Sequence, residues 1–228
     1  MAFRDELRRV RAIAWKDLTT ERRSKAGFNS VAALGITMLI LFGFALGPDP
    51  EALRHAAAGA IWLSALFAGV LAFNRSYQVE LESGALDQLL LYPGPRWSIY
   101  LGKLLANLLF VGLILVIVIL VGIALFQVRI PAAWPQLLGV FVLGAVGLVV
   151  LGTFYAAMAS RSRAREVLLP LLLFPMLVPL LLAAISASRA LLGGDVMHEA
   201  GAWVKLLAAY DLIFLVATLW AFEYVIEA

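Results

Sequence analysis

Few ionisable side chains of this 228-residue chain lie inside its apolar stretches, where a charge is costly and therefore informative. Asp211 is the clearest case, about 9 Å along the stretch 206–226 if that stretch is helical. A carboxylate there could carry protons or sodium ions, but a carrier would normally contain more such groups. Asp211 could instead pair with Arg189 or Lys205, or be an ordinary interfacial residue, and we favour the last interpretation.

The two histidines, His55 and His198, are the only imidazole groups of the chain. Either could bind the iron of a haem as an axial ligand. A single histidine in a loop is usually a solvated surface residue, however, and no partner ligand is evident in the sequence for either one. The haem-ligand interpretation and the surface interpretation therefore both stay open.

Other patterns that carry chemistry are absent from the sequence. The chain has no cysteine, which excludes disulfides, iron–sulfur ligation and thiol catalysis. It has no Gly-x-x-x-x-Gly-Lys-Ser/Thr loop for nucleotide, no His-Glu-x-x-His and no evident metal cluster. We therefore expect no catalytic and no metal-binding residues.

Six long apolar stretches dominate the chain. Hydrophobic residues make up 63% and charged residues 14%, whereas a soluble domain is about half apolar and a quarter charged. A membrane-crossing helix needs about 20 apolar residues. The sequence predicts an all-α polytopic membrane protein with six transmembrane helices, at 28–46, 56–74, 104–126, 137–160, 167–187 and 206–226.

Basic residues are unevenly divided among the segments that link these spans. Fourteen of the eighteen precede the first span or lie in the second and fourth links. The alternate links hold the other four, Arg54, Arg129, Arg189 and Lys205. By the positive-inside rule both termini are cytoplasmic. Basic residues beside a span normally meet anionic lipid, so we expect the lipid bilayer and no nucleic acid as the partner of this charge.

Residues 1–27 form a cytoplasmic segment ahead of the transmembrane domain, which we place at 28–228. Within 3–18, apolar residues recur at helical spacing and basic residues cover much of the rest. The apolar positions are Phe3, Leu7, Val10, Ala14 and Leu18. The pattern predicts an amphipathic helix in the plane of the inner leaflet; such a helix could instead pack on a partner protein.

The longest polar link, 75–103, is expected to be a cytoplasmic coupling segment. Ser83 could cap a short helix that begins near Gly84, and two prolines at 93 and 95 would end it. Its apolar face would consist of Leu86, Leu89 and Leu90, with Asp87 pointing away. Such a helix could dock into another protein or lie on the bilayer, and the local pattern does not separate these alternatives.

Three prolines distinguish the fifth span. Pro170 can be accommodated in a first turn, whereas Pro175 and Pro179 remove backbone donors inside the span, so a kink or break is expected. The span could line a pathway or move, or its kink could be purely structural. Span 137–160 instead carries four glycines, which predict close helix packing.

Several segments together resemble the haem exporter protein B family of cytochrome c maturation. The specific part runs from Gly59-Ala60-Ile61-Trp62-Leu63-Ser64 through Glu80-Leu81-Glu82-Ser83-Gly84-Ala85-Leu86-Asp87-Gln88-Leu89-Leu90-Leu91-Tyr92-Pro93. The turn Gly47-Pro48-Asp49-Pro50 and the leucine- and proline-rich run 168–181 also match. The family commonly has an acidic residue before the arginine that ends span two, whereas this chain has Asn74-Arg75, which puts a charge pair there in doubt.

The resemblance implies the fold of a type-2 ABC exporter permease, with 1–27 containing its elbow helix and 82–91 its coupling helix. It implies that a separate cytoplasmic ABC ATPase binds ATP and contacts Glu80, Glu82, Ser83, Gly84, Leu86, Asp87 and Leu89. It further implies a membrane haem-handling subunit, a haem chaperone, a homodimer or pseudo-dimer, and the bacterial inner membrane. Haem would be cargo and no resident cofactor is expected; alternatively, ATP hydrolysis releases a haem-loaded chaperone.

Three other functions stay open at this stage. The same machine could move a lipid, a drug or a polysaccharide, because no cargo-selective polar groups are evident. The chain could be a membrane assembly scaffold that transports nothing. An ion-coupled carrier is the third alternative, and it depends on Asp211.

Overall fold

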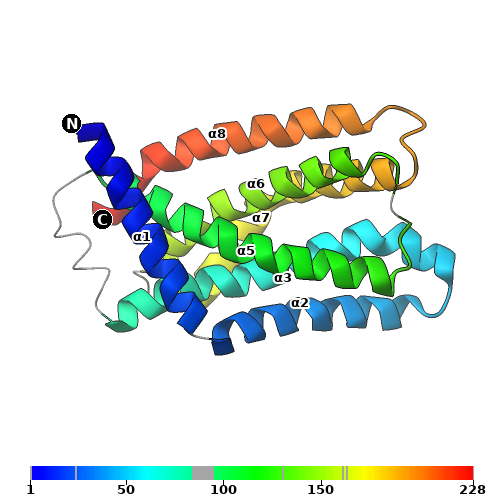
Figure 1. Cartoon of the computed structure of the whole chain (residues 1–228), viewed down its shortest axis with the longest axis horizontal. Helices are drawn as coiled ribbons and strands as arrows, with labels where there is room; N and C mark the ends of the chain where they lie inside the picture. The colour runs from blue at the N-terminus through cyan, green and yellow to red at the C-terminus, as the bar shows by residue number, and fades with distance from the viewer. Residues whose placement is uncertain are drawn as a thin grey trace.

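The computed structural model describes residues 2–23, 25–83, 95–129, 131–160, 162 and 164–227. Within this part of the chain all regular secondary structure is helical (Figure 1). The helices are α1 (Ala2–Arg23), α2 (Lys25–Leu46), α3 (Pro50–Ser83), α5 (Trp97–Leu125), α6 (Trp134–Ser160), α7 (Arg165–Leu192) and α8 (Ala200–Glu227).

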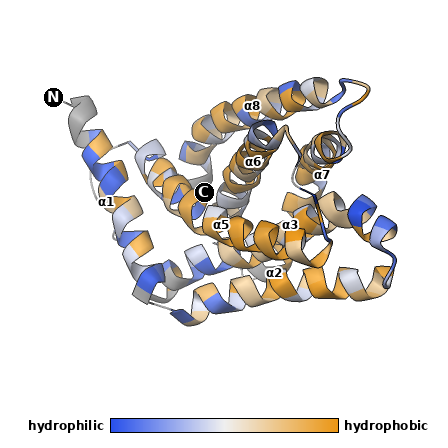
Figure 2. Ribbon diagram, turned by 45° about the vertical axis from the view of Figure 1, so that its right-hand side comes forward, coloured by the Kyte–Doolittle hydropathy of each residue, from blue (hydrophilic) through white to orange (hydrophobic). Residues whose placement is uncertain are grey.

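The helices α2 to α8 run along the long axis of the molecule, and α1 crosses them at one end (Figure 1). We call this end, which also holds both termini, the basal end, and the opposite end the distal end. Among the described residues, six helices are long and apolar enough to cross a membrane, which confirms the six predicted spans and the all-α class. Figure 2 shows that hydrophobic residues cover these helices, while hydrophilic residues gather on α1 and at the helix ends.

All six spans are longer than the sequence analysis placed them, and two of them extend well into the predicted coupling link. Helix α3 has 34 residues and continues through the predicted coupling link to Ser83, and α5 begins at Trp97, seven residues before the predicted start. No proline or glycine interrupts 70–83, so the helical hydrogen bonds continue past the apolar run. At the distal end the predicted turn is present: Gly47 adopts φ 75°, which a residue with a Cβ rarely adopts, and α3 starts at Pro50.

The three prolines of the fifth span lie inside α7, which continues from Arg165 to Leu192 without a break. Because α7 starts two residues before the predicted span, Pro170 lies beyond the first turn. The expected break is therefore wrong, while the expected kink stays a prediction. The Tyr210 hydroxyl of α8 donates a hydrogen bond to the Met176 carbonyl of α7, one residue after Pro175.

Helices α3 and α6 form the centre of the bundle. Helix α6 packs against α3, α5, α7 and α8, and α3 packs against α2, α5, α6 and α7. Hydrogen bonds between buried side chains join neighbouring helices: Trp62 Nε1 donates to Ser188 Oγ at 3.1 Å, and Asn107 Nδ2 to Thr153 Oγ1 at 3.0 Å. Such bonds and close packing hold helices together where lipid is as apolar as the helix surfaces.

Glycines make room for large aromatic rings at the α3–α6 contact, as the sequence predicted for the fourth span. A Cβ at Gly144 would meet the ring of Trp62, and a Cβ at Gly152 would meet the ring of Phe73. Both rings are almost fully buried, with exposed fractions of 1% and 0%. The two rings therefore fix the distance between α3 and α6.

Substitution of Gly152 by alanine should lower the thermal stability of the purified protein, because the new methyl group overlaps a ring that cannot move outward. Overpacking of this kind costs about 1–3 kcal/mol. The matched control is Gly139→Ala on the same helix, where a Cβ meets no atom within 4 Å. Thermal unfolding in detergent measures both, and equal melting temperatures for the two variants would contradict the proposed close contact.

Candidate functional site

Helix α1 packs on its own chain at the basal end, chiefly against α5. Val10, Ile13 and Ala14 are buried in this contact, and a Cβ at Gly102 of α5 would meet Ile13. The sequence analysis offered the bilayer or a partner protein for this apolar face and did not consider the bundle itself. Trp15 is exposed on α1, as expected for a helix that also borders the membrane interface.

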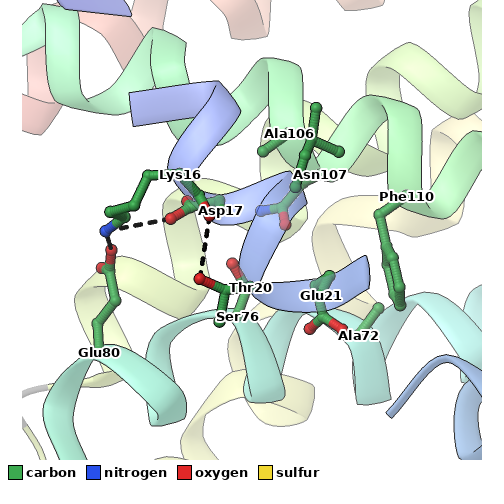
Figure 3. Close-up of a pocket in the computed structure, with 11 residues that line it drawn as sticks. Lys16, Asp17, Thr20, Glu21, Ala72, Ser76, Glu80, Ala106, Asn107 and Phe110 are labelled. Carbon is green, nitrogen blue, oxygen red and sulfur yellow. Dashed lines mark hydrogen bonds and ion pairs between the residues drawn. The ribbon is translucent and has the colours of Figure 1, made fainter. Parts of the chain in front are cut away.

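Charged residues of α1, α3 and α5 meet beneath this helix in a cluster of four. Lys103 Nζ of α5 lies 2.7 Å from Glu80 Oε2 of α3 and 3.3 Å from Asp17 Oδ2 of α1. Lys16 Nζ lies 3.1 Å from Asp17 Oδ1 and also pairs with Glu80 (Figure 3). We call Lys16, Asp17, Glu80 and Lys103 the basal ion cluster.

The basal ion cluster is electrically balanced and buried at its centre, while the Lys16 side chain is 40% exposed. The Lys103 side chain is fully buried, and that of Glu80 is 5% exposed. The ring of Tyr77 adds a cation–π contact, with its centroid 4.4 Å from Lys103 Nζ. Pairing with opposite charges offsets the large cost of removing Lys103 and Glu80 from water, so these two members depend on their partners.

Burial alone would raise the pKa of Glu80, but its contacts with Lys103 and Lys16 outweigh burial and hold that pKa below its ordinary value. Burial would likewise lower the pKa of Lys16, but its contacts with Glu80 and Asp17 raise that pKa above the ordinary value. Ionised Glu80 therefore stabilises the fold above about pH 4.5, its ordinary pKa. This stabilisation is lost as the pH falls from there through the lower pKa of the folded state. The raised lysine pKa contributes below about pH 10.5, and this contribution is lost at higher pH.

A second ion pair joins α1 to α3. Arg75 Nε lies 3.5 Å from Glu21 Oε1. Burial raises the pKa of Glu21, and the charge of Arg75 opposes this shift only in part. Although this chain has Asn74 in place of the acidic residue that commonly precedes the arginine, Arg75 still has a carboxylate partner. That partner is Glu21 of α1.

A small cavity of about 230 Å³ lies beside the basal ion cluster, between α1, α3 and α5. Figure 3 shows Lys16 extending toward Glu80 on one side, while Asn107 and Phe110 border the other side. Its lining includes Lys16, Asp17 and Glu80, which belong to the ion pairs that join α1 to α3 and α5.

The predicted coupling residues fall into two groups. Glu80, Glu82 and Ser83 belong to the last turns of α3, and the buried carboxylate of Glu80 binds α1 and α5. The short helix that we predicted from Gly84, with Leu86, Asp87 and Leu89, lies outside the described residues. Contact of all seven residues with an ATPase stays a prediction.

The two histidines are exposed residues at the distal end. His55 lies in the second turn of α3, and His198 precedes α8 with φ 54°. In the described part of the chain no three acidic or histidine residues gather to hold a metal ion. The haem-ligand role of either histidine stays a prediction.

The expectation that Asp211 is interfacial is wrong. Asp211 is 6% exposed and lies against Gly147, near the middle of α6, where the side chain of Leu180 also packs. Neither carboxyl oxygen has a hydrogen-bond partner among the described residues, and the alternative partners Arg189 and Lys205 are exposed. Gly147 of α6 makes room for the carboxylate of Asp211 on α8. Because the two residues are on different helices, the sequence near either one does not reveal this contact.

Sequence analysis missed Lys16, Asp17 and Lys103 as site residues. The available signal was Lys103, which stands among the apolar residues at the start of α5, where a buried lysine needs a carboxylate. Identification of that carboxylate required the packing, because Asp17 and Glu80 are 86 and 23 residues away in sequence.

Comparison with known proteins adds independent information. A family model described as "CcmB protein" matches residues 8–228. The chain is 34% identical to heme exporter protein B of Rhodobacter capsulatus, over 76% of this chain and 79% of the relative. It is 32% identical to the protein of the same name from Paracoccus denitrificans, over 82% and 86%, and 31% identical to that of Pseudomonas aeruginosa, over 77% and 78%.

The basal ion cluster predicts strong coupling between Glu80 and Lys103. Glu80→Gln and Lys103→Met should each destabilise the protein, by about 3–5 kcal/mol, since each leaves a buried charge poorly paired. The double variant should lose much less than the sum of the two single losses. Unfolding in detergent measures all three, with Lys205→Met at an exposed position as the control; additive losses would mean that the pair does not interact.

Proposed function

The chain belongs to the CcmB protein family and is a membrane permease subunit of the haem-export and cytochrome c maturation ABC system, and we propose that it couples ATP hydrolysis on a separate subunit to movement of its spans. The observation that carries this proposal is the basal ion cluster. It joins α1, α3 and α5 three residues before the end of α3. The predicted coupling helix follows that end directly.

Helix α3 is suited to transmit a displacement from the basal to the distal end. It is one continuous helix of 34 residues and contacts α2, α5, α6 and α7. A helix of that length spans about 50 Å. A push on 84–94 by an approaching ATPase would therefore act on the end of a stiff element in the centre of the bundle, and α2, α3 and α7 would tilt.

The basal ion cluster determines which elements move with α3. Glu80 binds Lys16 of α1 and Lys103 of α5, so α1 and the first turns of α5 follow the end of α3. Displacement without them would separate buried charges, which is costly. The coupling segment thus acts on a rigid base of three helices.

The partners are the finer part of the proposal. A cytoplasmic ABC ATPase would supply nucleotide binding, since the sequence has no nucleotide loop of its own, and this chain would be non-catalytic. A membrane haem-handling subunit, a haem chaperone and a second copy or homologue of this chain would complete the complex. The family membership supports membrane partners of the ABC system in general.

We further propose that the chain resides in the bacterial inner membrane with its basal end in the cytoplasm. The support is the charge distribution, because fourteen of eighteen basic residues precede the first span or lie in the second and fourth links. Haem would be cargo and not a resident cofactor. Either haem itself moves, or hydrolysis releases a haem-loaded chaperone.

Changes in the coupling helix should abolish ATPase binding without affecting membrane insertion. Asp87→Lys reverses a charge, and Leu89→Asp places a charge on the predicted docking face, so each should prevent co-purification of the ATPase. Glu51→Lys is the matched control, an exposed acidic residue of α3 at the distal end. ATPase recovered at wild-type levels with either coupling variant would contradict the proposed contact.

A second candidate function, an ion-coupled carrier, is favoured by one observation, the buried and unpartnered carboxylate of Asp211. Under the coupling mechanism Asp211→Asn should leave cytochrome c maturation in cells intact, since no step requires the charge. Melting temperature provides the control for folding. Lost maturation with an unchanged melting temperature would favour the carrier and count against ATP-driven coupling.

A further inference from the structure

Three of the four basic residues at the distal end line one cavity. Arg54 comes from the start of α3, Arg129 from the link between α5 and α6, and Arg189 from the last turn of α7. The cavity has a volume of about 560 Å³, within the range of small-molecule sites, about 300–1,000 Å³. The positive-inside rule leaves few basic residues on this side, so their convergence is a feature of the tertiary structure.

The cavity has an excess of positive charge. Glu199 is the acidic residue among its lining groups, and in the described part of the chain none of the three arginines forms an ion pair with a carboxylate. Arg54 Nε donates to the Gln127 carbonyl at 3.3 Å, which directs this side chain toward the α5–α6 link. The other guanidinium donors stay available to a ligand.

The same cavity lining also contains apolar residues. Val128, Leu192 and Trp203 contribute aliphatic and indole surface, and Trp203 is partly buried at the start of α8. Guanidinium groups bind carboxylate and phosphate through paired hydrogen bonds, and the indole offers a flat face to an apolar body. The lining therefore fits a molecule that has both an anionic group and an apolar body.

We propose that the distal cavity is a binding site for an anionic amphiphile, whose carboxylate or phosphate groups pair with Arg54, Arg129 and Arg189. Two sources supply this chemistry: a porphyrin dicarboxylate, which rests on the proposed function in haem export, and the headgroup of an anionic phospholipid, which does not. His55 also lines the cavity, so an iron porphyrin would meet an imidazole there.

The test compares the wild type with the triple variant Arg54→Gln/Arg129→Gln/Arg189→Gln. Lys205→Gln is the matched control, because Lys205 is the fourth distal basic residue and is not among the cavity-lining groups. Protoporphyrin IX is titrated into each protein in detergent and followed by fluorescence anisotropy. Its dimethyl ester, which has no free carboxylates, is the control ligand. Phosphatidylglycerol is added as a competitor.

Protoporphyrin IX should bind the wild type and Lys205→Gln equally. It should bind the triple variant about tenfold more weakly or worse, and the dimethyl ester should bind the wild type more weakly by a similar factor. A phospholipid site would instead appear as phosphatidylglycerol that co-purifies with the wild type and is lost from the triple variant. The proposal is overturned if protoporphyrin IX and phosphatidylglycerol each bind the wild type and the triple variant equally, or if neither of them binds. Co-purification of the ATPase is measured with the same triple variant. ATPase recovered at wild-type levels would show that the coupling mechanism stands even where the cavity proposal fails.

Discussion

The hydrocarbon core of a membrane supplies no water to backbone amides and no hydrophobic force between helices. The spans of this protein therefore satisfy most of their backbone groups within each helix, and the helices must be held together by other means. Two kinds of contact do this in the centre of the bundle: aromatic rings that lie against glycines, as Phe73 does against Gly152, and buried side-chain hydrogen bonds such as that from Trp62 to Ser188. Both kinds need accurate geometry, so they define one arrangement of α3, α6 and α7.

At the basal end the problem is different, because charges must be kept near the membrane. The basal ion cluster pairs two lysines with two carboxylates among three helices, and it buries Lys103 and Glu80 most completely. A buried ion pair stabilises little relative to apolar residues, but its geometry is strict and the loss of one member is costly. Such a cluster is suited to make helices move together, which is what a permease needs where an ATPase acts on it.

The two ends of the bundle use positive charge in opposite ways. At the basal end Lys103 is fully buried and neutralised by carboxylates, so its charge is structural. At the distal end Arg54, Arg129 and Arg189 are exposed and line a common cavity, so their charge is available to a ligand. Coupling to a partner at one end and recognition of an amphiphile at the other would then be joined through the continuous length of α3.

The sequence by itself determined the class, the six spans, the glycine packing of α6 and the family, because long apolar runs and local motifs depend only on neighbouring residues. The coupling role of 75–103 stays a prediction, and the sequence ended α3 nine residues too early at Asn74, since α3 continues beyond the apolar run. Only the tertiary structure decided that Glu80 faces Lys103, that Asp211 lies against Gly147, and that three distal arginines share a cavity. The physical reason is that charge pairing and burial depend on which helix faces cross in space, and residues as far apart as 17 and 103 carry no local sign that they meet.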